Sequence, residues 1–207
     1  MFQSFSPNML KTFEQCPKKF HFKYVKKIGM PMNDDIFEFG KNIHAIASYY
    51  LRKENITKME ESLTEEEKKI WFYLKNIEYF SYETINTEYN LSFKLEKIFF
   101  GGGLDALVKK GDTYYVLDYK TGAVPKKSVY DFQTMIYLLA VREFFKTDKV
   151  VFIYIDLRNK KEVQINLTKD LVKEYEEKLL ITIGKIKNEE FTKRLKDCSC
   201  EYNIICF

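Results

Sequence analysis

Asp105, Asp118 and Lys120 stand in the stretch GGGLDALVKKGDTYYVLDYKTG. Gly111-Asp112 separates two segments rich in β-branched, leucine and tyrosine residues, which predicts a β-hairpin with a tight turn. Pairing across that turn places Asp105 directly opposite Asp118. Side chains alternate between the two faces of a strand, so Lys120 shares a face with Asp118. One face of one hairpin therefore carries two acids and a lysine.

The two opposed carboxylates repel each other, so their pairing needs a reason. A divalent cation supplies one, because Mg²⁺ and Mn²⁺ bind carboxylate oxygens and leave positions for water and phosphate. Beside such an ion, Lys120 could orient and help deprotonate an attacking water, or neutralise charge on a phosphate. The alternative is a solvated hairpin edge with ordinary surface charges, and spacing alone does not separate the two.

A histidine lies on the helix predicted for residues 38–53. Apolar residues and glycine recur there at helical spacing, and His44 belongs to that stripe. A histidine in such a stripe is usually a packing residue. The need of Asp105 and Asp118 for a third ligand from a facing element favours a ligand instead.

A polar pair stands on the helix predicted for residues 129–145. Gln133 and Tyr137 are four residues apart and share a face beside an apolar stripe. They could hydrogen-bond a phosphate or the acidic cluster. The alternative is a boundary position at the rim of the core.

Three of the four cysteines, Cys198, Cys200 and Cys206, lie in the terminal stretch CSCEYNIICF, and the fourth is Cys16. Four thiolates suit Zn²⁺ or an iron–sulfur cluster, and the spacing does not choose between them. Either centre would tie the two chain ends together. The alternative is a set of unrelated thiols.

Composition indicates a soluble globular protein. The chain has 207 residues, 45% of them hydrophobic, and a net charge of +4, which permits a polyanionic partner. We expect an intracellular, cytoplasmic protein, because no secretory signal or membrane-spanning run is evident. The first 28 residues contain one acid, Glu14, against six lysines: Lys11, Lys18, Lys19, Lys23, Lys26 and Lys27.

The remaining elements predict an α/β or α+β sheet flanked by helices. Ser6 caps a first helix that Pro17 interrupts. A helix over 62–82 is capped by Thr64 or Ser62, and a strand over 88–100 leads into the glycine triplet. Two more strands, 150–156 and 162–167, precede a helix that Thr168 caps and that runs to about residue 187. Glu88 could be a further acid near the metal, although a surface charge is the simpler interpretation.

The stretches SPNMLKTFEQCPKKFHFKYV, GKNIHAIA, GGGLDALV, LDYKTG and QTMIY follow one another in this order. Together they resemble the PD-(D/E)XK nuclease superfamily, specifically its RecB-like branch. The cysteines resemble the iron–sulfur members of that branch, which include AddB-type nuclease domains and CRISPR-associated adaptation nucleases. The resemblance implies a restriction-endonuclease-like α/β fold whose N- and C-terminal segments join at a cysteine-ligated cluster. It implies one domain over 1–207, with 1–30 and 190–207 bearing the cluster and 35–187 forming the nuclease core.

The resemblance also implies roles for individual residues. Lys120, Asp105 and Asp118 would be catalytic. The metal ligands would be His44, Asp105, Asp118 and the Tyr119 carbonyl. Gln133 and Tyr137 would form the DNA-binding motif that follows. A [4Fe-4S] cluster would be held by Cys16, Cys198, Cys200 and Cys206.

The chain departs from the family pattern at two places. Cys198 and Cys200 are separated by one residue where the family has two, which makes Cys198 the least secure ligand. Asp118 replaces the glutamate of the superfamily name, as it does in many RecB-like members.

The expected function is a Mg²⁺- or Mn²⁺-dependent deoxyribonuclease, an exonuclease on single-stranded DNA or DNA ends. A role in CRISPR spacer acquisition, with CRISPR adaptation integrase proteins as partners, follows from the resemblance. The alternative is a non-catalytic DNA-end-binding or assembly module with a structural iron–sulfur or zinc centre.

Overall fold

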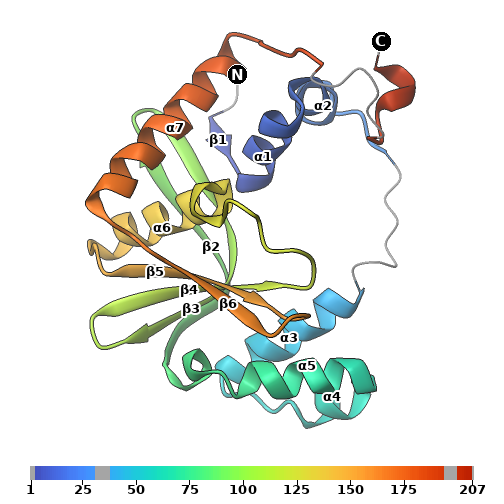
Figure 1. Cartoon of the computed structure of the whole chain (residues 1–207), viewed down its shortest axis with the longest axis vertical. Helices are drawn as coiled ribbons and strands as arrows, with labels where there is room; N and C mark the ends of the chain where they lie inside the picture. Colours follow the sequence, from blue (N-terminus) through green and yellow to red (C-terminus); the bar gives the residue numbers. More distant parts are fainter. Residues whose placement is uncertain (1–2, 31–37, 194–199, 207) are drawn as a thin grey trace.

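The computed structural model describes residues 3–30, 38–193 and 200–206. In this part of the chain, one mixed sheet of six strands carries helices on both faces (Figure 1). The strands are β1 (Ser4–Phe5), β2 (Glu83–Leu95), β3 (Ile98–Lys110), β4 (Thr113–Lys120), β5 (Val150–Asp156) and β6 (Lys161–Asn166). The α-helices are α1 (Pro7–Gln15), α2 (Pro17–Phe20), α3 (Glu38–Leu51), α4 (Thr57–Ser62), α5 (Glu65–Lys75), α6 (Phe132–Phe145) and α7 (Lys169–Lys187). These elements confirm the predicted α/β sheet flanked by helices.

The sheet runs in the order β1-β3-β4-β5-β6, with β2 paired to β3. β2, β3 and β4 are antiparallel neighbours, whereas β4 and β5 are parallel. Parallel strands need a crossover connection, and α6 supplies it. The N-terminus of α6 therefore lies near the end of β4, the strand that carries Asp118 and Lys120.

The strands bury side chains on both faces, because neighbouring residues point in opposite directions. Val116 packs in a core with residues of α1, α6 and α7. Leu117, the next residue, packs in a second core with residues of α3 and α5. Figure 1 shows the two sets of helices on opposite sides of the sheet. The site residues of β4 thus lie in a strand that is covered on both faces.

The first helix begins as predicted. Ser6 is the N-cap of α1, its Oγ accepts the Met9 N–H at 3.3 Å, and Pro7 occupies the first turn. The helix ends at Cys16, and Pro17 opens the short α2. Leu10 and Phe13 of α1 are buried in the core that contains α6. α1 is therefore packed directly against the helix that follows the acidic strand.

The hairpin formed by β3 and β4 has the predicted register. Lys110 pairs with Thr113, and Gly111 has the positive φ of 58° that a tight turn favours. The pairing extends to Ala106 and Leu117. Asp105 and Asp118 are the next residues beyond that last pair.

The prediction of one strand over 88–100 was wrong. The chain instead forms a second hairpin, with β2 and β3 meeting at Glu96, whose φ is 53°. The glycine triplet lies inside β3, and a Cβ on Gly101 would lie 2.5 Å from the Leu91 carbonyl oxygen. Gly101 therefore permits the close approach of β2 and β3.

Two helices differ from their predicted ranges, α5 at its end and α6 at its start, although the predicted cap Thr64 is confirmed. Thr64 caps α5 in a capping box with Glu67, and that helix ends at Lys75, well short of Tyr82. α6 starts at Phe132, since Asp131 accepts the Gln133 N–H and acts as its N-cap. Among the described helices, none combines the length and the apolar character that crossing a bilayer would require.

Candidate active site

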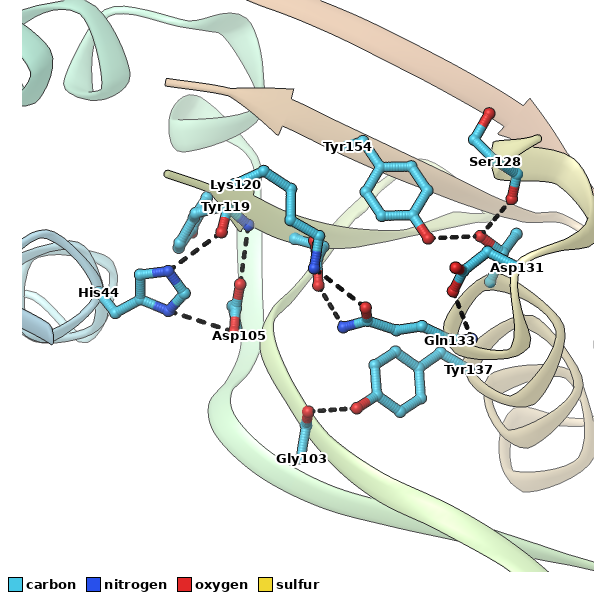
Figure 2. A network of polar contacts seen from close by, with 12 residues as sticks. His44, Gly103, Asp105, Tyr119, Lys120, Ser128, Asp131, Gln133, Tyr137 and Tyr154 are labelled. Atoms are coloured by element: carbon cyan, nitrogen blue, oxygen red, sulfur yellow. Dashed lines mark hydrogen bonds and ion pairs between the residues drawn. The ribbon is translucent and has the colours of Figure 1, made fainter. Parts of the chain in front are cut away.

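His44 and Asp105 are brought together by α3 and β3 (Figure 2). The His44 Nδ1 atom lies 3.3 Å from Asp105 Oδ1, and His44 Nε2 lies 3.1 Å from the Tyr119 carbonyl oxygen. Ile43 and Ile46 are fully buried on the same helix and hold α3 on the sheet. Three members of the predicted metal-ligand set therefore converge on one point.

The fourth predicted ligand, Asp118, belongs to an adjoining polar cluster. Its Oδ2 lies 2.7 Å from Lys120 Nζ, and its Oδ1 accepts a hydrogen bond from Gln133 Nε2. Lys120 also donates to Gln133 Oε1 at 3.0 Å. Asp118 and Lys120 are two residues apart on one strand face, as the alternation predicted, and Gln133 of α6 contacts both. Figure 2 shows the Gln133 amide beside the Lys120 ammonium.

Tyr137 lies one helical turn after Gln133 and faces β3. Its hydroxyl donates to the Gly103 carbonyl oxygen at 2.5 Å. A Cβ on Gly102 would lie 3.0 Å from that hydroxyl and 3.3 Å from Pro7 Cδ. The glycines thus let α6 and the start of α1 approach the strand that carries Asp105.

The electrostatics of the cluster are those of crowded carboxylates. Burial and the charge of Asp105 together raise the pKa of Asp118 to about 6, against the opposing effect of Lys120. Burial lowers the pKa of His44, but the hydrogen bond and the charge of Asp105 outweigh it, so the net direction is upward. Burial and the charge of Asp105 raise the pKa of Glu88. Asp118 and Glu88 are thus more costly to ionise than free carboxyl groups.

Among the described residues, His44, Glu88 and Asp105 form a group able to hold a metal ion, with ligand atoms within 4.8 Å of one another. Carboxylate and imidazole donors fit Mg²⁺ or Mn²⁺. Asp118 Oδ2 is buried beside the Lys120 ammonium, which lies 2.7 Å away. The donor chemistry of His44, Glu88 and Asp105 fits a divalent metal.

Glu88 is an acid that the sequence favoured as a surface charge. It is exposed on β2 with a φ of 49°. The pairs Thr87–Ala106 and Tyr89–Leu104 flank it, so its place in the ladder is opposite Asp105. Recognising the turn at Glu96 would have revealed this position.

Three of the four predicted cysteine ligands lie among the described residues. Cys16 and Cys200 are half-buried and Cys206 is buried, whereas Cys198 lies outside the described residues. The chain ends contact each other near these residues. Lys19 pairs with Glu201 at 2.9 Å, and the Tyr202 hydroxyl donates to the Ile28 carbonyl at 2.8 Å. These contacts place the C-terminal segment beside the residues that follow Cys16.

Residues 4–207 match the model of the PD-(D/E)XK nuclease superfamily. The chain belongs to this superfamily. PD-(D/E)XK nucleases use divalent metal ions, in agreement with the donor set formed by His44 and the acids. The predicted superfamily is confirmed, whereas the roles of individual residues stay predictions.

Two known proteins are similar to this chain, one in sequence and one in fold. The chain is 31% identical over 127 residues to the CRISPR-associated exonuclease Cas4 of Francisella tularensis subsp. novicida. That alignment covers 57% of this chain and 61% of the relative, which is less than two thirds of the relative's length. The fold is similar to a solved structure from Eubacterium rectale named "Putative exonuclease", with a TM-score of 0.61 and 13% identity. That match covers 97% of this chain and 88% of the other, and it supports the fold alone.

Proposed function

We propose that this protein is a divalent-metal-dependent deoxyribonuclease that acts on single-stranded DNA or DNA ends. The observation that carries the proposal is the meeting of two clusters from four elements. His44, Asp105 and the Tyr119 carbonyl converge at one point, and Asp118, Lys120 and Gln133 converge beside it. Superfamily membership and similarity to an exonuclease support the same conclusion.

In this proposal His44, Asp105, Asp118 and the Tyr119 carbonyl hold Mg²⁺ or Mn²⁺, with Glu88 as a further acidic donor. When bound, the ion supplies Lewis-acid stabilisation of charge on a phosphodiester. The Lys120 ammonium orients the attacking water and neutralises charge on the phosphate, and Gln133 holds that ammonium in place at 3.0 Å. Tyr137 keeps α6 against β3, so the two clusters stay aligned.

Basic and aromatic side chains near the N-terminus suit a nucleic acid strand. Lys18 Nζ lies 5.5 Å from the centre of the Phe22 ring, and Lys23 Nζ lies 5.7 Å from that of Tyr24. Lysines neutralise phosphates, and partly exposed rings such as Phe22 and Tyr24 can stack on bases that are not paired. This surface favours single-stranded DNA or the frayed end of a duplex.

The test is cleavage of end-labelled single- and double-stranded DNA with Mg²⁺, with Mn²⁺ and with a chelator. Wild-type protein is expected to cleave only with metal, and Asp105→Ala and Lys120→Ala are expected to abolish cleavage without unfolding the protein. Lys149→Ala is a matched control, because Lys149 also pairs with an aspartate, Asp112, but away from the site. Full activity in both site variants would exclude this site.

The alternative class is a non-catalytic DNA-end-binding or assembly module. It shares the basic N-terminal surface and the fold, but it requires no reactive lysine. A protein that binds DNA ends and shows no metal-dependent cleavage under any of these conditions would support that class. Retention of the acids, the histidine and the lysine in one cluster favours the nuclease.

We also propose that Cys16, Cys198, Cys200 and Cys206 hold a [4Fe-4S] cluster. The contacts between the chain ends near Cys16 and Cys200 support a shared centre. Protein purified without oxygen is expected to be brown and to contain iron and acid-labile sulfide. Colourless protein with bound zinc would replace the cluster with a zinc centre, which four thiolates also suit.

Similarity to a CRISPR-associated exonuclease supports a role in CRISPR spacer acquisition. In that role CRISPR adaptation integrase proteins are the expected partners. Co-purification of the separately produced proteins, with and without a DNA end, tests the association. Genes for CRISPR adaptation proteins beside the gene for this chain would support the role, and repair or phage genes there would oppose it.

A further inference from the structure

Lys11 reaches the candidate active site from the first helix of the chain. It lies on α1, ahead of Cys16, and its side chain is 25% exposed. Its Nζ atom lies 2.8 Å from Asp131 Oδ1 and 3.5 Å from Gln133 Oε1. A lysine of the first helix thus contacts both the N-cap and the second residue of the helix that carries the site.

The Gln133 amide must point one way for the site to be assembled. Its Oε1 accepts from Lys120, and its Nε2 donates to Asp118. An amide can be turned end for end, and its partners decide which orientation is stable. With Lys11 as a second ammonium beside Oε1, the reversed amide would present its NH₂ group to two cations. Lys11 therefore disfavours the reversed orientation.

Asp131 adds a second reason for the position of Lys11. The Asp131 carboxylate is 11% exposed, and its Oδ1 accepts the Gln133 N–H at 2.8 Å. Without Lys11, the Asp131 carboxylate would lose the one ion pair that it makes among the described residues. Charges at such separations interact strongly where water is partly excluded.

We propose that Lys11 is a positioning residue of the nuclease site. It holds the Gln133 amide oxygen toward Lys120 and neutralises the Asp131 carboxylate. The proposal rests on the proposed nuclease function for its kinetic consequence, but its geometry stands independently of activity. Through Lys11, helix α1 would contribute to the active site.

The kinetic test replaces Lys11 with methionine, which keeps most of the apolar stem and removes the charge. Lys11→Met is expected to lower kcat about tenfold while KM changes less than about threefold, because orientation rather than binding is lost. Lys11→Arg is expected to restore most of kcat. In a Gln133→Ala background, Lys11→Met should have a much smaller effect, because only the neutralisation of Asp131 is left to lose.

Lys178→Met is the matched control. Lys178 also anchors α1, through Glu14 at 3.1 Å, and it approaches the Tyr130 carbonyl at 3.4 Å. Among the described residues, it makes no hydrogen bond or ion pair with the Asp131 or Gln133 side chains. An equal loss of kcat in Lys178→Met would show that Lys11 only anchors the helix, and would overturn the proposal.

A measurement that does not depend on catalysis tests the positioning role of Lys11 separately from the proposed nuclease function. The side-chain NH₂ resonances of Gln133 in a ¹⁵N-correlated NMR spectrum report its orientation and partners. Lys11→Met should shift them, and Lys178→Met and Lys11→Arg should leave them near their wild-type positions. Unchanged resonances in Lys11→Met would overturn the positioning proposal even if the enzyme is active. If the wild type does not cleave DNA but Lys11→Met shifts these resonances as expected, only the proposed nuclease function is overturned.

Discussion

The backbone N–H of Tyr119 donates a hydrogen bond to Asp105 Oδ2 at 2.7 Å. This contact forms immediately beyond the last paired residues of the β3–β4 hairpin. It occupies one oxygen of Asp105 and leaves Oδ1 facing His44. The same residue, Tyr119, turns its carbonyl toward His44. A backbone hydrogen bond between adjacent strands therefore orients a carboxylate toward a helix.

Asp105→Asn should weaken binding of Mn²⁺, because it removes a charged oxygen donor without removing much volume. We expect a loss of at least about tenfold in affinity, measured by calorimetric titration at neutral pH. Glu88→Gln should weaken binding less, since Glu88 is exposed. Glu83→Gln, at the start of β2, is the control and should bind as wild type. Unchanged affinity in Asp105→Asn would contradict the assigned ligand set.

Asp118→Asn should stabilise the metal-free protein at neutral pH. The folded-state pKa of about 6 lies above the ordinary value of 3.8, so the folded protein holds this proton more tightly than the unfolded chain. The free energy of unfolding therefore falls as pH rises through that window and levels off above it. The asparagine resembles the protonated acid and should raise the free energy of unfolding by roughly 1–3 kcal/mol at pH ~7.

The measurement is urea denaturation of the wild type and of Asp118→Asn with a chelator present, at pH values from below 3.8 to above about 6. The difference between them should disappear on the acid side, where the carboxyl of the wild type is protonated. A difference that is independent of pH would point to packing rather than charge. Asp118→Asn should also lose nuclease activity, because the ionised carboxylate that destabilises the fold is the group that the proposed mechanism requires.

Gly101→Ala should destabilise the fold, because the new Cβ would lie 2.5 Å from the Leu91 carbonyl oxygen and 2.6 Å from Ser92 Cβ. Overpacking of this kind costs about 1–3 kcal/mol. Gly184→Ala is the opposite case, since nothing lies within 4 Å of its Cβ and the residue is inside α7. That change should stabilise the protein by about 1 kcal/mol. Thermal midpoints that move in the same direction for both variants would refute this account.

Glu67→Gln should loosen the support of the helix that carries His44. Glu67 is 3% exposed and accepts hydrogen bonds at 2.8 Å from Asn42 Nδ2 and from the Thr64 N–H. Burial raises the pKa of Glu67, but these hydrogen bonds outweigh it and keep the pKa below the ordinary value of 4.5. The stabilisation is therefore present above that value and is lost as pH falls through the depressed pKa.

We expect Glu67→Gln to lower the free energy of unfolding by about 1–2 kcal/mol at neutral pH, as for the loss of a charged helix cap. Glu66→Gln, on the exposed side of the same helix turn, should change it little. The two variants are compared with wild type by denaturation at neutral and acid pH. A deficit of Glu67→Gln that persists in acid would argue against a role for its charge.

Local patterns were sufficient for the elements whose contacts are close in sequence. The turn at Gly111 places Asp118 and Lys120 on one strand face, and the cap at Ser6 starts α1, because each depends on a few neighbouring residues. The turn at Glu96 was missed because it lacks glycine, asparagine or proline. That omission also concealed the position of Glu88 opposite Asp105.

The sequence by itself determined the hairpin, its register and the side of β4 on which the acid and the lysine stand. Only the tertiary structure decided that His44 turns both ring nitrogens toward Asp105 and Tyr119, and that Lys11 reaches Gln133. In a hairpin, regular backbone hydrogen bonds fix which side chains lie opposite each other, and the turn sets that register. The approach of α3 and α1 to that strand depends instead on how their buried faces pack against the sheet, and no local spacing specifies it.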